Sequence, residues 1–133
     1  MSGLIFRTFA LCLALVFSIG ASMAGNLPTL SNSQSGVTIK VTPKSLNAET
    51  WEFNVVFDTH SQELKDDLLK SAVLVDAAGT QISPIDWKGA PPGGHHREGV
   101  LRFNVPAPAP SAFELRFVRP GEQKPRSFKW TLK

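Results

Sequence analysis

The sequence predicts an all-β fold, an antiparallel immunoglobulin-like β-sandwich of about seven strands with one short helical turn. Two observations favour it: short segments in which apolar and polar residues alternate, and proline- or glycine-containing turns between those segments. Alternation with a period of two gives a strand one buried face and one solvated face. The Cys-Trp-Cys pattern of true immunoglobulin domains is absent. A small β-barrel is the alternative fold.

The strand pattern is clearest from Trp51 to Asp58, where Trp51, Phe53 and Phe57 fall on one face. The first strand begins at Val37 and is expected to end at Pro43. The other expected strands are 72–75, 81–83, 85–87, 100–105, 113–117 and 128–132. Prolines 106, 108 and 110 exclude a central strand and predict a stiff crossover.

Residues 61–70 form the one helix candidate, because Leu64 and Leu68 are four residues apart and Ser61 is a suitable N-cap. The segment is short, so it predicts a turn or two of helix. Trp51 and Trp130 are in phase with the apolar faces of their strands and are expected in the core.

Residues 1–24 have the pattern of a signal peptide, with Arg7 before an apolar stretch of about a dozen residues and Ser22-Met23-Ala24 at the cleavage site. A transmembrane helix needs roughly 20 apolar residues, so none is expected after cleavage. Residues 25–36 are polar and aperiodic, which predicts a flexible lead-in. Residues 37–133 are expected to form the β-sandwich domain. Cys12 is interpreted as part of the signal peptide, which leaves no cysteine for a disulfide.

The formal net charge is +3, which does not by itself indicate an anionic partner. Nucleic acid is not expected, because the aromatic residues occupy core-facing strand positions and offer no stacking platform. The partner is expected to be an unknown protein or envelope component, and no cofactor is expected unless the histidines bind a metal.

The most specific hypothesis is a divalent metal site made by His60, His95, His96 and Asp58. Imidazole suits zinc, copper and nickel, and a carboxylate often orients a ligating histidine. Such a site requires the D-T-H-S and G-G-H-H-R loops to meet at one end of the sandwich. Adjacent histidines on an extended backbone point opposite ways, so the histidines could instead satisfy loop backbone groups.

Two other hypotheses concern the same loops. Asp58, His60 and Ser61 are the residue types of a catalytic triad, but on a strand Ser61 points away from the other two, so no enzyme is expected. Trp87, Gly93, Gly94 and Arg97 are candidates for an interaction surface. Gly93, Gly94 and Arg97 could form an anion-holding nest, or Arg97 could pair with Asp58 or Glu98. A proline-glycine loop that is shaped only for backbone turns is the preferred interpretation.

Several motifs together resemble a group of small exported prokaryotic β domains with no established activity. They are D-T-H-S (58–61), L-K-D-D-L (64–68), W-K-G (87–89), P-P-G-G-H-H-R (91–97), G-V-L-R-F (99–103) and F-K-W-T-L (128–132). The resemblance implies an exported β domain and no particular activity.

These observations predict an exported, non-enzymatic binding or structural module in the periplasm or outside the cell. A metal-binding protein for copper or zinc is the alternative function.

Overall fold

The computed structural model describes residues 27–47 and 49–132. The expected signal peptide, residues 1–24, lies outside these residues. The elements in chain order are β1 (Leu30–Gln34), β2 (Val37–Asn47), β3 (Thr50–Thr59), α1 (Leu68–Ser71), β4 (Ala72–Asp76), β5 (Gln81–Ile82), β6 (Pro84–Gly89), β7 (His96–Asn104), β8 (Ala112–Phe117) and β9 (Arg126–Thr131).

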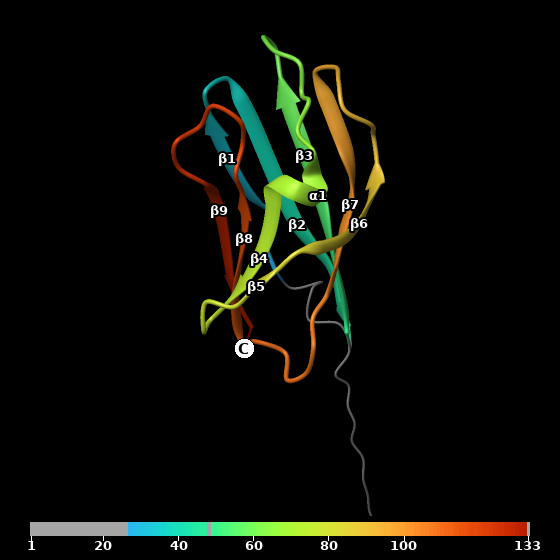
Figure 1. Cartoon of the computed structure of the whole chain (residues 1–133), viewed down its shortest axis with the longest axis vertical. Coiled ribbons are helices and arrows are strands. Elements are labelled where there is room, and N and C mark those ends of the chain that lie inside the picture. Colours follow the sequence, from blue (N-terminus) through green and yellow to red (C-terminus); the bar gives the residue numbers. More distant parts are fainter. Residues whose placement is uncertain (1–26, 48, 133) are drawn as a thin grey trace, which may run out of the picture.

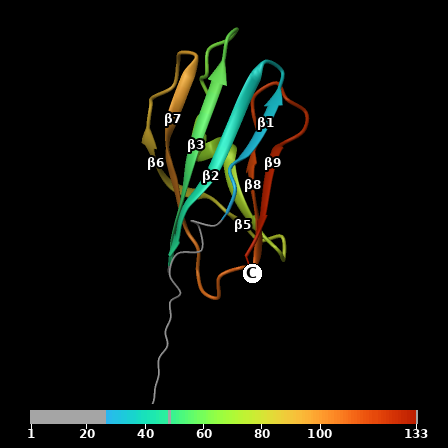
Figure 2. The same ribbon diagram turned by 180° about the vertical axis from the view of Figure 1, so that it is seen from behind.

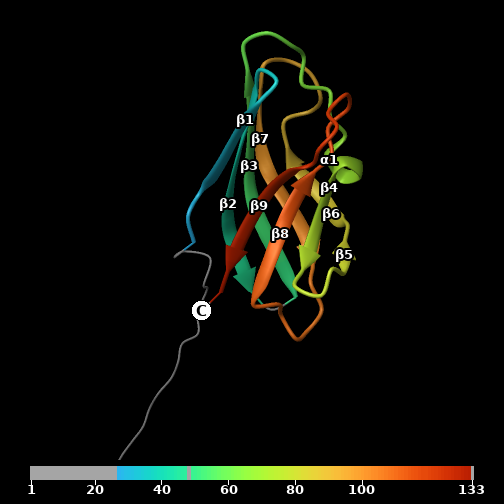
Figure 3. The same cartoon turned by 90° about the vertical axis from the view of Figure 1, so that its left-hand side faces the viewer.

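The strands form two antiparallel sheets, one in the order β1-β2-β3-β7-β6 and the other in the order β5-β4-β8-β9. The sheets face each other as two layers, as the side view in Figure 3 shows. They do not join into a closed barrel within residues 27–47 and 49–132. The predicted β-sandwich is therefore confirmed and the barrel alternative is wrong.

The core lies between the layers and consists of the residues that alternation assigned to the buried faces. On β3, Trp51, Phe53 and Phe57 are fully buried, and Trp130 of β9 is also buried. Trp51 meets Phe113 edge-on with ring centroids 4.9 Å apart. The core positions predicted for Trp51 and Trp130 are confirmed, and this aromatic cluster accounts for much of the apolar surface removed from water.

One strand was not expected from the sequence. Residues 25–36 were interpreted as a flexible lead-in, but Leu30–Gln34 forms β1 and pairs along β2 from Leu30↔Val41 to Gln34↔Val37. Ser35 and Gly36 make the turn with positive φ angles of 54° and 79°. The sheet therefore begins before Val37, and the predicted boundary at Val37 is wrong.

Two other expected boundaries are also wrong. Pro43 does not end its strand, because β2 continues to Asn47. The register of β2 against β3 shifts between Pro43 and Ser45, and at such an irregularity the N–H that proline lacks is not needed for the ladder of hydrogen bonds. The helix is a single turn, Leu68–Ser71, and its N-cap is Asp67, whose Oδ1 accepts a hydrogen bond from the Leu69 N–H at 3.1 Å. Ser61 lies several residues before it.

Four connections gather at the upper end of the sandwich in Figure 1, and the same end is seen from behind in Figure 2. They are the β1–β2 turn and the loops 60–67, 90–95 and 118–125. We call this the loop end. The short turn 77–80 and the proline-rich connection 105–111 lie at the opposite end. Within the part of the chain that is described, no helix has the length and apolar character needed to cross a lipid bilayer.

Candidate functional site

Backbone hydrogen bonds join the two candidate loops. The Thr59 N–H donates to the His95 carbonyl at 3.0 Å, and the Leu64 N–H donates to the Gly94 carbonyl at 3.0 Å. In return, the Gly93 N–H donates to the Leu64 carbonyl at 2.7 Å. The expectation that these loops meet at one end of the sandwich is confirmed. These links are made by the backbone, and the side chains of His60 and His95 take no part in them.

His96 is held between two carboxylates on the outer face of the larger sheet. Asp58 and His96 are cross-strand partners on β3 and β7, and His96 Nδ1 lies 2.5 Å from Asp58 Oδ1. His96 Nε2 lies 3.2 Å from Glu98 Oε1. The hydrogen bond with Asp58, followed by that with Glu98, raises the pKa of His96. More than half of the imidazole surface remains exposed, at 56%.

The four proposed metal ligands do not converge. Asp58 reaches His96, but the two nitrogens of His96 face different carboxylates, so those three groups do not surround one ion position. His60 and His95 are exposed, and His95 contributes its backbone carbonyl to the loop junction. In residues 27–47 and 49–132, no group of three or more His, Cys, Asp or Glu side chains is arranged to hold a metal.

The triad residues do not form a hydrogen-bond chain among the described contacts. The Asp58 carboxylate is engaged by His96 and not by His60. Ser61 is exposed, and its backbone N–H donates to Thr59 Oγ1, which itself donates to the Gly36 carbonyl at 2.8 Å. A serine nucleophile needs an imidazole within hydrogen-bond reach, and no contact of the described chain supplies one to Ser61.

Arg97 turns into the protein. Only 2% of the residue is exposed. Its Nη1 donates to the Asp66 carbonyl at 2.7 Å and its Nη2 donates to the Ala90 carbonyl at 3.2 Å. Burial lowers the pKa of Arg97. The alternative of an anion nest at Gly93, Gly94 and Arg97 is not supported, because the Gly93 N–H is already bonded and the guanidinium reaches carbonyls. Arg97 forms no ion pair with Asp58 or Glu98 among the described contacts.

Trp87 lies beside Arg97. Its Nε1–H donates to the same Ala90 carbonyl at 2.9 Å, and the Arg97 guanidinium carbon is 5.8 Å from the centre of the indole ring. The ring also covers a place where two backbones meet closely: a Cβ on Gly99 would lie 2.5 Å from the Gly89 Cα and 2.8 Å from the indole. These contacts fix the orientation of Trp87.

A buried charge network joins the remaining loops and was not predicted. Arg119 pairs with both carboxylate oxygens of Asp66 and with Glu122. Glu122 in turn accepts from Arg126 at 2.7 and 2.8 Å. Desolvation alone would lower the pKa of Arg119, but the hydrogen bond and charge of Asp66, with Glu122, outweigh it and raise that pKa.

Arg126 extends this network to the N-terminal hairpin. Its guanidinium donates to the backbone carbonyls of Asn32, Gln34 and Val37 at 2.7–3.3 Å. The sequence did carry a signal for this arrangement: Arg126 is in the strand phase of Phe128 and Trp130, which face inward, and Arg97 is likewise in phase with Leu101 and Phe103. A charged residue at a strand position that faces inward indicates that a buried partner satisfies its charge.

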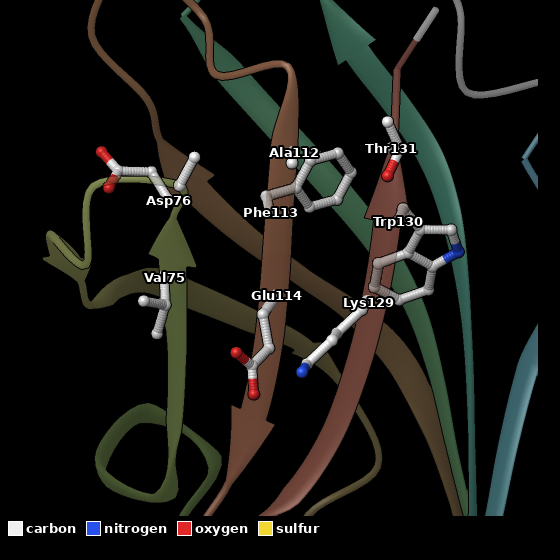
Figure 4. Close-up of a pocket in the computed structure, with 9 residues that line it drawn as sticks. Val75, Asp76, Ala112, Phe113, Glu114, Lys129, Trp130 and Thr131 are labelled. Carbon is white, nitrogen blue, oxygen red and sulfur yellow. The ribbon is translucent and has the colours of Figure 1, made fainter.

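The surface hollows in the described part of the chain include two that border charged side chains. The first, of about 220 Å³, lies over β8 and β9, where Glu114 and Lys129 are cross-strand partners beside the rings of Phe113 and Trp130 (Figure 4). The Glu114 carboxylate is already engaged by Arg116 and Ser127, and the hydrogen bond from Arg116 is the main reason that its pKa is lowered. The Glu114 carboxylate is therefore not free to bind a ligand in this hollow.

The second hollow, of about 320 Å³, lies beside α1, and we call it the α1 hollow. Its lining residues are Asp66, Asp67, Leu68, Leu69, Trp87, Pro92 and Arg97. It therefore contains Trp87 and Arg97 of the predicted interaction surface, but not Gly93 or Gly94.

Comparison with known proteins adds no assignment: no protein-family model matches the chain, and no curated protein or solved structure matches it either.

Proposed function

We propose that the protein is an exported, non-enzymatic module that binds a protein or envelope component through its loop end. The observation that carries the proposal is the way in which the loops are fixed. Three backbone hydrogen bonds join the end of β3 and loop 60–67 to loop 90–95. The buried charges of Asp66, Arg119, Glu122 and Arg126 tie loop 118–125 to loop 60–67 and to β1.

Fixed loops favour binding, because little conformational entropy is lost when a partner is engaged. Binding residues are commonly carried by loops on a rigid scaffold. A non-catalytic role is supported by the Asp58 carboxylate, which is engaged by His96, and by the lack of a hydrogen bond from His60 to Ser61 among the described contacts. Export rests on the signal-peptide pattern of residues 1–24.

The test is site-specific photocrosslinking in cells that export the protein. A photoreactive amino acid replaces His95, which is exposed at the loop end, or Ala78, which is exposed in the turn at the opposite end. We expect a discrete light-dependent product from position 95 and none from position 78. The same products from both positions, or no product from position 95 and from a second loop-end position such as His60, would overturn the proposal.

A further inference from the structure

Four strands lie at the edges of the two sheets, β1 and β6 in the larger sheet and β5 and β9 in the smaller one. Arg126 donates to backbone carbonyls of β1, β9 contacts β1, and β5 has only two residues. Strand β6 differs from these edges, because no hydrogen bond of the described chain reaches the side that faces away from β7. Figures 1 and 2 show β6 at the margin of the larger sheet. Such an edge is a template for pairing with another chain.

The pairing with β7 determines which backbone groups of β6 are free. The Ala90 N–H donates to the Glu98 carbonyl at 3.1 Å, and opposite residues in an antiparallel pair alternate between bonded and non-bonded positions. The N–H and C=O groups of Trp87 and Gly89 therefore point away from β7. Ile85 has no partner on β7, because the register shifts at this residue. Residues 85, 87 and 89 thus present a row of unpaired backbone groups.

The charges on the outer face of β6 are complementary to those of a second copy. Glu52, Arg102 and Asp86 form a cross-strand row of alternating sign that ends at Asp86 on the free edge. Within this row, Arg102 Nε lies 3.4 Å from Asp86 Oδ1. Lys88 is exposed and forms no ion pair within the described residues. A cation placed beyond Asp86 would continue the row, and the Lys88 of a second copy is such a cation.

We propose that the protein forms a symmetric dimer in which β6 pairs antiparallel with β6 of a second copy, so that Trp87 lies opposite the partner's Trp87. This register joins the free backbone groups of residues 85, 87 and 89. It places Asp86 of each copy directly opposite the partner's Lys88, at a non-bonded position where side chains are closest. A slip of two residues in either direction keeps the backbone pattern but sets Asp86 or Lys88 opposite its own copy, and like charges directly opposite are destabilising.

The same register accounts for the exposed side chain of Ile85, 43% of which is accessible. In the dimer Ile85 lies opposite the partner's Gly89, which has no side chain to obstruct it. The two larger sheets become one continuous sheet, and the loop ends of the two copies point in opposite directions because antiparallel pairing reverses one copy. The inference does not depend on the proposed function, since β6 is not part of the loop end.

The test measures self-association of the purified protein by sedimentation equilibrium. Lys88→Glu leaves only negative charges on the edge and Asp86→Lys leaves only positive ones, so each variant alone should associate at least about tenfold more weakly than the wild type. An equal mixture of the two should form a heterodimer with nearly wild-type affinity, because every cross-strand pair is again of opposite sign. Lys40→Glu makes the same charge change on the outer face of β2 and should leave association unchanged.

Hydrogen exchange locates the interface. The Trp87 and Gly89 amides should exchange more slowly as the protein concentration rises, and the amides of β9 should not respond. A wild-type protein that stays monomeric up to about 1 mM overturns the inference. Association that Lys88→Glu leaves unchanged also overturns it, as does a mixture that stays monomeric while both variants keep the wild-type tryptophan fluorescence. Lys88→Glu alters an exposed side chain, so it tests the pairing even if Asp86→Lys fails to fold.

Discussion

The ion pair of Asp66 and Arg119 provides a quantitative test of how the loop end is stabilised. Arg119 Nε and Nη2 donate to the two carboxylate oxygens at 2.9 and 3.0 Å, and only 1% of the Asp66 side chain is exposed. Arg119→Met removes both hydrogen bonds and leaves a buried carboxylate without its partner. Breaking a buried pair by removing one member costs about 3–5 kcal/mol.

The expected loss is a large part of the stability of an ordinary domain, which is about 5–15 kcal/mol. At about 4 °C for each kcal/mol in a domain of about 100 residues, the Tm should fall by about 12–20 °C. Arg119→Met also removes the 3.1 Å hydrogen bond to Glu122, but Glu122 keeps its two hydrogen bonds from Arg126, so most of the loss should come from Asp66. Urea unfolding followed by tryptophan fluorescence measures the free energy, and a thermal melt measures the Tm.

The control is the double variant Asp66→Leu/Arg119→Met, which replaces both charges with apolar side chains. Such replacements of a whole buried pair are often neutral or stabilising, so the double variant should recover more than half of the loss. A loss below about 1 kcal/mol in R119M would show that the pair behaves like a surface ion pair. A double variant as unstable as the sum of its two single variants would contradict the coupling between the residues.

Four further outcomes are expected. Gly99→Ala should destabilise the fold by about 1–3 kcal/mol in urea unfolding, because its Cβ would meet the Gly89 backbone and an indole at under 3 Å. Because the pKa of His96 is raised, its ion pairs with Asp58 and Glu98 stabilise the protein fully below the usual histidine pKa of about 6.5. This stabilisation is lost as the pH rises through the folded-state pKa, and it is within about 1 kcal/mol because the groups are exposed. The lowered pKa of Glu122, caused first by Arg126, gives stabilisation that is present above the usual carboxyl pKa of about 4.3 and is lost as the pH falls through the folded-state pKa. Calorimetric titration with zinc, copper or nickel should give no tight one-to-one binding, because the ligands do not converge.

Each of these has a matched comparison. His96→Gln and Glu122→Gln should remove the respective pH dependence of the unfolding free energy, and an unchanged pH profile in either variant would contradict the assignment. Gly79→Ala is not a suitable control for Gly99→Ala, because Gly79 has a positive φ of 88° and alanine would be strained there for that reason alone. The wild-type protein, measured in parallel, is the comparison for Gly99→Ala. Tight metal binding that is abolished by His60→Ala would restore the metal hypothesis.

The sandwich itself could be predicted because its signals are local. Alternation along Trp51–Asp58 or 113–117 depends only on neighbouring residues, and the structure buries the expected face of each. β1 could not be predicted in this way. Its Ser- and Asn-rich sequence has no apolar alternation, and it is held by pairing to β2 and by hydrogen bonds from Arg126, which lies 92 residues after Gln34.

The candidate site was predicted in its position and not in its contacts. The loops meet as expected, but which side chains touch depends on strand register, which places Asp58 opposite His96. His60 follows Asp58 by two residues, yet it lies beyond the last paired residue of β3 and takes no part in that contact. Arg97 was expected at an interaction surface and not in the interior, and no role was expected for Arg119 or Arg126, because alternation alone does not show which buried group will neutralise a charged residue.

The bonds from Arg126 to the first hairpin also constrain the order in which the chain can fold. Strand β1 receives its bonds from Arg126 at sequence separations of 92 and 94 residues, and the Trp130 indole donates to the Pro28 carbonyl across 102 residues. The N-terminal hairpin therefore cannot be completed until the last strand is available. A domain with such distant contacts folds slowly and as a whole, and a nascent chain that lacks β9 has not yet formed these contacts to its first hairpin.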